Sequence, residues 1–243
     1  MRSRLLVVPA MAVLAITGCS SAPERASTIG GSTASGAVTQ EQTSEAPKPK
    51  GAGDRLSRAQ AKSALLTVSD LPTGWASEKS KPDKKSSSKI EPASCQKMFD
   101  ELSAKTEGKK AKVKEKATFS QGGMLGANLE TEVSSFDTEV QSDRIKNIVA
   151  ALTKCADITS TENGKKAEIQ MSALSFPNLG DQTLAMRMKV KTQGISGVAD
   201  VVLVSVGHNV VSFMTAGLQP IPGPELEKIA RAGVTKLGTA AKS

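Results

Sequence analysis

Stretches in which apolar and polar side chains alternate are the feature that most limits how this chain folds. In one of them, Val113, Ala117 and Phe119 alternate with Lys114 and Lys116. Successive side chains of a β-strand point to opposite faces of a sheet, so this pattern predicts a strand with one buried face. Alternation, or an apolar run that suits a central strand, predicts strands over 113–121, 129–136, 167–173, 184–191, 198–206 and 210–216.

Other segments carry the spacing of amphipathic helices. Cys95, Met98, Phe99 and Leu102 follow one another at i, i+3, i+4 and i+7, which places them on one face of a helix. Helices are predicted over 56–67, 92–104 and 137–155, and a last one opens at Pro224. We therefore expect an α+β fold: a single domain in which an antiparallel sheet of about five to six strands packs against flanking helices.

The N-terminus has the organisation of an export signal. Arg2 and Arg4 precede an apolar stretch over residues 5–16, which is too short for a membrane span of about 20 residues. The stretch ends in Ile16-Thr17-Gly18-Cys19, which resembles a bacterial lipobox. The resemblance implies cleavage after a signal peptide over 1–18 and lipidation of Cys19, with palmitate among the acyl chains. The protein would then be anchored to the outer face of the plasma membrane. The alternative is an ordinary secretory signal with an unrelated cysteine.

Composition divides the remaining chain in two. Residues 19–54 are mostly Ser, Thr, Ala, Gly, Pro and Gln, so they cannot bury enough apolar surface to fold and are predicted to form a disordered tether. Residues 55–243 are long enough to bury a core and form the predicted domain.

If Cys19 is lipidated, Cys95 and Cys155 are the two cysteines that remain, and in an oxidising compartment they are expected to form a disulfide. Two buried free thiols are the alternative.

The sequence lacks the common signatures of catalysis and of cofactor sites. It has a single histidine, His208, at an expected turn, and it contains no GxSxG, HExxH, Walker A or GxGxxG motif. Aromatic residues make up 2% of the chain, too few for a surface on which nucleic-acid bases stack. We expect no enzyme activity, no cofactor, no metal site and no nucleic-acid partner.

One row of basic side chains is the best candidate for a binding site. Arg187, Lys189 and Lys191 project from one face of a predicted strand, where they could contact an anionic envelope ligand or a lipid. A solvated strand face without a ligand is the alternative reading. The carboxylates of Glu130 and Glu132 are expected instead to pair with Lys114 and Lys116 on the neighbouring strand.

The segment Leu65-Leu66-Thr67-Val68-Ser69-Asp70-Leu71-Pro72-Thr73-Gly74-Trp75 resembles an opening motif of actinobacterial surface lipoproteins. With the paired cysteines and the order of elements, residues 55–240 are similar to the extracellular sensor domain of mycobacterial PknH-type serine/threonine kinases. The resemblance implies an antiparallel sheet with flanking helices and a cleft for a ligand. The family's sensor domain has two disulfides, whereas this chain retains cysteines for one.

These observations favour a lipid-anchored, non-enzymatic ligand-binding or sensor-like domain of the cell envelope. The first alternative is a lipid or glycolipid carrier with an apolar cavity, for which Met171, Met186 and Met188 are candidate lining residues. Two further alternatives are a structural partner of other envelope proteins and an enzyme with an unrecognised site. The sequence identifies neither the ligand nor a protein partner.

Overall fold

The computed structural model describes residues 53–242, except 80–87, 108–110, 124–125 and 141. The predicted signal peptide (1–18), Cys19 and the tether as far as residue 52 lie outside the described residues. The last two residues of the predicted tether contact the domain. The Gly53 carbonyl accepts a hydrogen bond of 2.9 Å from the His208 amide, and the Asp54 carbonyl accepts one of 2.7 Å from Asn209 Nδ2.

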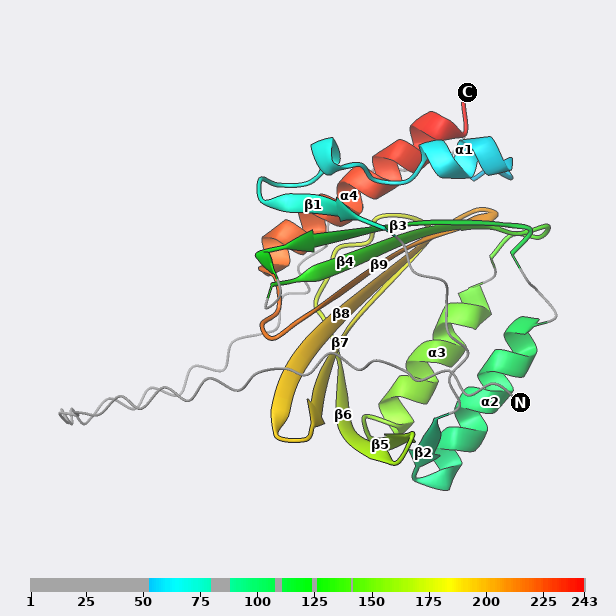
Figure 1. The fold of residues 1–243 in the computed structure, drawn as a ribbon. Coiled ribbons are helices and arrows are strands. Elements are labelled where there is room, and N and C mark those ends of the chain that lie inside the picture. The colour runs from blue at the N-terminus through cyan, green and yellow to red at the C-terminus, as the bar shows by residue number, and fades with distance from the viewer. Residues whose placement is uncertain (1–52, 80–87, 108–110, 124–125, 141, 243) are drawn as a thin grey trace, which may run out of the picture. The chain divides into compact units, whose positions relative to one another are not determined.

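A single antiparallel sheet dominates the fold (Figure 1). Its nine strands lie in the order β1-β3-β4-β9-β8-β7-β6-β5-β2. The strands are β1 (Trp75–Glu78), β2 (Lys89–Glu91), β3 (Val113–Gln121), β4 (Asn128–Ser135), β5 (Asp157–Glu162), β6 (Lys165–Ala173), β7 (Gln182–Thr192), β8 (Ile195–Val206) and β9 (Asn209–Gly217). Two-residue turns, Asn163-Gly164 and Gln193-Gly194, join β5 to β6 and β7 to β8, and all four of these residues have positive φ as tight hairpins require.

The expected fold class was therefore wrong in its proportions. The described residues form a mostly-β fold around nine strands, where the sequence predicted an α+β fold with about five to six. The six predicted strands are present, and β1, β2 and β5 were missed. β1 and β2 have four and three residues, too short to show alternation, and β5 carries one large apolar residue, Ile158.

The helices agree with the predicted positions but differ in length. They are α1 (Arg58–Ser63), α2 (Ala93–Glu107), α3 (Ser142–Lys154) and α4 (Gly223–Ala240), with a 3₁₀ turn over Val68–Asp70. α1 is shorter than expected, and α3 begins at Ser142 rather than near residue 137. No helix in the described part of the chain is both long and apolar enough to cross a membrane.

The two faces of the sheet carry separate cores. Figure 1 shows α1 and α4 on one side of the sheet and α2 and α3 on the other. On the α4 face, the first core includes Trp75, Phe119, Val202, Phe213 and the buried side of α4. On the α3 face, the second core comprises Cys95, Cys155, Ile158 and Met171, with further side chains from α2, α3 and β7 packed against it.

The predicted disulfide is confirmed at the centre of the second core. Cys95 and Cys155 are bonded, and each is 2% exposed. The bond joins the first turn of α2 to the residue that follows α3. It therefore ties β2 and α2, which lie at the edge of the sheet, to α3 and β5.

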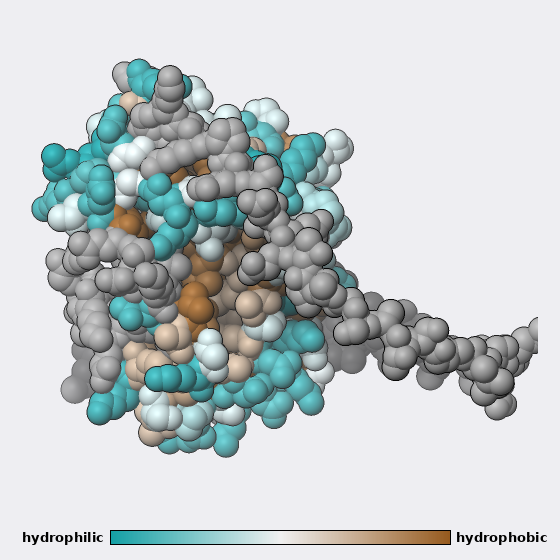
Figure 2. All heavy atoms as spheres, turned by 180° about the vertical axis from the view of Figure 1, so that it is seen from behind, coloured by the Kyte–Doolittle hydropathy of each residue, from teal (hydrophilic) through white to brown (hydrophobic). Residues whose placement is uncertain are grey.

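The outer surface is mixed in character. Among the coloured residues of Figure 2, hydrophilic side chains lie mainly around the rim, and apolar side chains gather in a hollow near the middle. Among the described residues, the large apolar side chains with substantial exposure are Val68, Val149, Ile195, Met214 and Leu218. Leu218 and Val149 each line a pocket, and the two pockets are described below.

Candidate functional site

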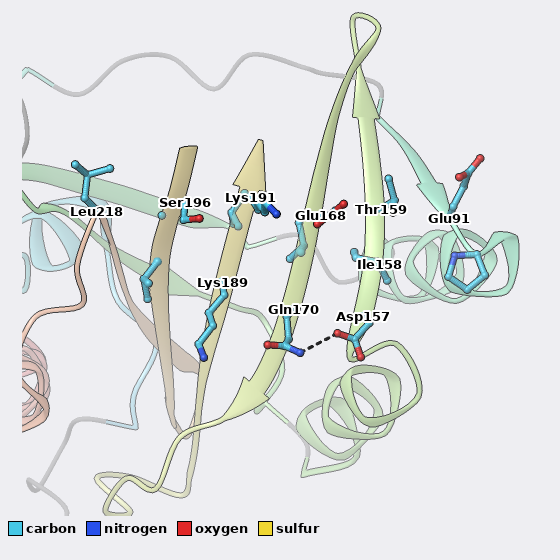
Figure 3. A pocket seen from close by; sticks show the side chains of 15 residues that line it. Glu91, Asp157, Ile158, Thr159, Glu168, Gln170, Lys189, Lys191, Ser196 and Leu218 are labelled. Atoms are coloured by element: carbon cyan, nitrogen blue, oxygen red, sulfur yellow. Dashed lines mark hydrogen bonds between the residues drawn. The ribbon is translucent and has the colours of Figure 1, made fainter. Parts of the chain in front are cut away.

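An open groove lies on the α4 face of the sheet, beyond the area that α1 and α4 cover. α1 packs on β3 and β4, and α4 packs on β9. Beyond them, the face of β5, β6, β7 and β8 forms a cavity of about 800 Å³ (Figure 3). Its lining includes the side chains of Glu91, Asp157, Thr159, Glu168, Gln170, Lys189, Lys191, Ser196, Val198 and Leu218.

The register of the sheet brings the polar lining together. Lys189 lies opposite Gln170, and Lys191 lies opposite Glu168, so these four side chains project from the same face. Gln170 in turn donates a hydrogen bond of 3.1 Å from Nε2 to Asp157 Oδ1 on β5. The register thus puts Glu168 and Gln170 beside the lysines, in the floor of the groove.

Two of the three basic residues singled out in the sequence are available to a ligand. Lys189 and Lys191 are exposed, and neither forms an ion pair with a described residue. Glu168 is likewise exposed and forms no ion pair with a described residue, although Lys191 is its direct cross-strand neighbour. The groove therefore offers two free ammonium groups beside one free carboxylate.

Arg187, the third member of the row, is engaged within the protein. Its Nε and Nη2 donate hydrogen bonds of 2.7 and 2.8 Å to the two carboxylate oxygens of Asp200. The Asp200 side chain is fully buried, whereas that of Arg187 is 27% exposed. The hydrogen bonds to Asp200 raise the pKa of the Arg187 guanidinium, because they outweigh the opposing effect of partial burial. Arg187 therefore neutralises a buried charge beside the groove.

The carboxylates at the margin limit how cationic the groove is. Glu91 Oε1 lies 3.0 Å from Lys89 Nζ, and the hydrogen bond and charge of Lys89 lower the pKa of the Glu91 carboxyl. Asp157 stays close to the floor through Gln170. Glu91, Asp157 and Glu168 give the lining three acidic groups against two lysines, so its summed charge does not attract anions. An anion would therefore be bound through direct contacts with Lys189 and Lys191.

Other residues singled out in the sequence have structural roles. Lys114 pairs with Glu132 at 2.8 Å and Lys116 with Glu130 at 3.7 Å, which confirms the expected cross-strand pairs. His208 Nδ1 donates a hydrogen bond of 3.1 Å to the Phe136 carbonyl, so this side chain joins the β8–β9 turn to the segment after β4.

The methionines predicted to line a carrier cavity lie on the α3 face of the sheet. There they pack in or beside the second core, and in the described part of the chain they do not surround an apolar cavity. Met171 is 8% exposed and belongs to the second core. Met188 packs against the same core, and Met186 is half-buried on the same face of β7. Their positions favour core packing over ligand contact.

The motif that ends in Trp75 ties the start of the domain to its last helix. Asp70 accepts hydrogen bonds from the Thr67 amide and hydroxyl and from Lys236 Nζ on α4, the last at 2.7 Å. Trp75 is 4% exposed, and its Nε1 donates a hydrogen bond of 3.1 Å to Glu225 Oε1. Gly74 between them has φ +103°, a conformation suited to glycine. The motif therefore serves the fold.

Neither a protein-family model nor a curated protein matches the chain. Among solved structures, the extracellular domain of PknH from Mycobacterium tuberculosis is similar, with a TM-score of 0.57 and 16% identity over 77% of this chain and 99% of that one. An uncharacterised protein of Mycobacterium smegmatis, the Rv0999 ortholog, aligns with a TM-score of 0.40 and 14% identity over 79% and 98% of the two chains. The resemblance to the PknH-type sensor domain is thus confirmed at the level of the fold.

Proposed function

We propose that the chain is a lipid-anchored protein on the outer face of the plasma membrane, and that its domain binds a ligand without catalysing a reaction. The groove over β5–β8 carries the proposal, because it is open, has a volume of about 800 Å³ and presents two lysines that form no ion pair with a described residue. The lipobox-like sequence before Cys19 supports the anchor, and the fold shared with an extracellular domain supports the location.

The anchor is proposed to act through Cys19 and the segment that follows it. Two acyl chains suffice for stable attachment. If the segment after Cys19 is disordered, as its composition predicts, its roughly 35 residues would span about 30–35 Å on average. Replacing Cys19 with Ala should release the protein or leave an uncleaved precursor, as cell fractionation and intact-mass measurement would show. A variant that remains membrane-bound at the mature size would contradict the proposed anchor.

The ligand is proposed to present an anionic group, such as a lipid phosphate, to Lys189 and Lys191. These two side chains project from one face of β7 at alternate positions, so their Cβ atoms are separated by about 7 Å, close enough for both ammonium groups to reach one phosphate. The carboxylates of Glu168 and Asp157 would accept hydrogen bonds from hydroxyl groups next to that phosphate. A phosphate flanked by hydroxyl groups therefore fits the lining.

Calorimetric titration with glycerophosphoglycerol, the deacylated headgroup of phosphatidylglycerol, tests this proposal. The Lys189→Gln/Lys191→Gln variant should bind about tenfold more weakly, a loss of about 1.4 kcal/mol, since each of the two exposed ionic contacts contributes up to about 1 kcal/mol. Lys62→Gln/Lys228→Gln removes the same charge from exposed positions on α1 and α4 and should bind like the parent. Binding should also weaken as ionic strength rises from about 50 to about 300 mM. Equal affinity of the two double variants would refute the proposed contact.

A further inference from the structure

The end of the sheet where β8 begins presents large aliphatic side chains to solvent. Ile195, the first residue of β8, is 50% exposed, and Leu218, which follows β9, is 44% exposed. The register sets them at the same end, because Gly217 lies opposite Val198 near the start of β8. Exposed aliphatic side chains that gather at one place often mark an interaction surface.

The β5–β6 turn adds lysines to this end. Ala167 of β6 lies opposite Thr192 of β7, so the β5–β6 and β7–β8 turns are neighbours. Lys165 and Lys166 follow the β5–β6 turn and are exposed, and neither forms an ion pair with a described residue. Glu162 lies opposite Lys165 and offsets part of their charge. This end of the sheet therefore combines aliphatic side chains with a small excess of positive charge.

The lysine groove opens at the same end. Figure 3 shows Leu218, Ser196 and Lys191 along the side of the groove that lies toward the strand tips. Lys191 is one residue from the end of β7. A phospholipid whose phosphate is bound at Lys191 would therefore have its apolar part within reach of Leu218.

The described chain enters the domain at the opposite end of β8. The Gly53 carbonyl accepts a hydrogen bond from the His208 amide in the β8–β9 turn. β8 has 12 residues, which corresponds to a length of about 40 Å. If residues 20–52 are disordered, as their composition predicts, they would span about 30–35 Å on average and about 100 Å when extended. An anchor at Cys19 therefore leaves the start of β8 free to reach the membrane.

We propose that the β5–β6 turn, the β7–β8 turn and Leu218 dock on an anionic bilayer, so that the groove receives the headgroup of a lipid that stays in the membrane. The headgroup rests on the function proposed above, whereas the docking rests on the exposed residues. Ile195 and Leu218 enter the boundary between headgroups and acyl chains, and Lys165 and Lys166 contact lipid phosphates. The anchor keeps the domain close to the bilayer, so weak docking suffices.

Cosedimentation of the mature chain, residues 19–243, with vesicles tests the docking without the anchor. The protein carries Cys19→Ala, which prevents lipidation, and the vesicles contain phosphatidylglycerol and phosphatidylcholine in equal parts. Ile195→Asp should weaken vesicle binding at least about tenfold, because a carboxylate that the lipid phosphates repel replaces an aliphatic side chain. Parent-like binding by Ile195→Asp, or no binding of the parent at millimolar lipid, would overturn the proposal.

Val149→Asp is the matched control for this substitution. Val149 of α3 is 43% exposed and lines a separate pocket of about 520 Å³ together with Gln182. Gln182 is the first residue of β7, so this pocket lies at the other end of that strand from the β7–β8 turn. The control introduces the same charge away from the docking surface and should bind vesicles like the parent. A loss equal to that of Ile195→Asp would overturn the assignment to one end of the sheet.

Titration with glycerophosphoglycerol separates this inference from the proposed function. Ile195 does not belong to the groove lining, so Ile195→Asp should bind the free headgroup like the parent. If the parent does not bind the headgroup but Ile195→Asp still loses vesicle binding, the proposed ligand is wrong and the docking stands. If the variant binds both the headgroup and the vesicles like the parent, the docking is wrong and the ligand stands.

A fluorescent label shows which end of the domain meets the bilayer. Cys95 and Cys155 are bonded, so in the chain that cannot be lipidated an introduced cysteine is the single free thiol. Gln219→Cys places the label just after the end of β9, and Lys242→Cys places it beyond α4, whose 18 residues span about 27 Å. Spin-labelled lipids should quench a nitrobenzoxadiazole label at the first position and not at the second. Equal quenching at both positions would overturn the proposed orientation.

Discussion

The basic side chains along β7 differ in what each charge does. Lys189 and Lys191 are exposed and free, whereas Arg187 holds the buried carboxylate of Asp200 through two hydrogen bonds. From the sequence alone, all three side chains were predicted to share one role, contact with an anionic ligand. The sequence nevertheless contains a pattern that predicts the Arg187–Asp200 ion pair. Asp200 interrupts an apolar run, and a two-residue turn at Gln193-Gly194 places Asp200 directly opposite Arg187.

Arg187→Gln should therefore destabilise the fold. Removing one partner of a buried ion pair leaves an uncompensated charge, so the free energy of unfolding should fall by about 3 kcal/mol. Arg187→Leu combined with Asp200→Val removes both charges and should recover most of that loss. Lys189→Gln is the control and should change stability by less than about 0.5 kcal/mol. Urea denaturation measures all three, and a parent-like midpoint for Arg187→Gln would contradict this role.

The Asp70 carboxylate makes part of the stability depend on pH. Partial burial by itself would raise the pKa of this carboxyl, but hydrogen bonds from Lys236 and Thr67 and the charge of Lys236 outweigh it, so the pKa lies below its ordinary value. A carboxyl with a lowered pKa in the folded state stabilises the protein above its unfolded pKa. That contribution is lost as pH falls through the folded value.

Asp70→Asn should thus lower stability at neutral pH but not in strong acid. The variant keeps an acceptor for the Thr67 amide and loses the charge that faces Lys236, so we expect a loss of about 1–2 kcal/mol near pH 7. The difference from the parent should shrink as pH falls below about 4 and vanish near pH 2. Thermal unfolding of the parent and the variant across this pH range tests the prediction. A stability difference that grows on acidification would contradict it.

At the scale of elements, the sequence predicted the strands that show alternation or a long apolar run and missed those that show neither. β3 and β4 were predicted because each carries two large apolar residues on one face, Val113 and Phe119 in β3 and Leu129 and Val133 in β4. β5 was missed because Ile158 is its one large apolar side chain, although Asn163-Gly164 after it is a strong hairpin signal. The groove was only partly predictable for the same reason, since the sequence identified the lysines of β7 and not their neighbours on β5.

Close packing of α4 on the sheet depends on a glycine. A Cβ added at Gly233 would lie 2.5 Å from Cζ of Phe213, a ring that is fully buried and cannot move aside. Gly233→Ala should therefore cost about 1–3 kcal/mol through overpacking. Gly223→Ala in the first turn of the same helix has open space and should be neutral or slightly stabilising. Equal melting temperatures for the two variants would show that the helix adjusts without cost.

At the scale of the whole molecule, one sheet supports two cores that differ in how they are held. The first core is continuous from Trp75 through β3, β4, β9 and β8 to α4. The second core is smaller, and its helix α2 contacts the sheet through β2 at the outermost edge. The Cys95–Cys155 bond is therefore the main covalent constraint on the part of the molecule that is least supported by packing.

Reduction of this bond should loosen the second core before the first. The bond closes a loop of 60 residues, which on the chain-entropy model contributes about 4 kcal/mol to stability. Hydrogen exchange after reduction should thus accelerate in β2, α2, α3 and β5 while β8, β9 and α4 stay protected, because the two cores lie on opposite faces. The Cys95→Ala/Cys155→Ala variant should show the same pattern without reductant, which separates loss of the bond from side effects of the reagent. Uniform acceleration across both faces would mean that the sheet unfolds as one unit and that the two cores are not independently stable.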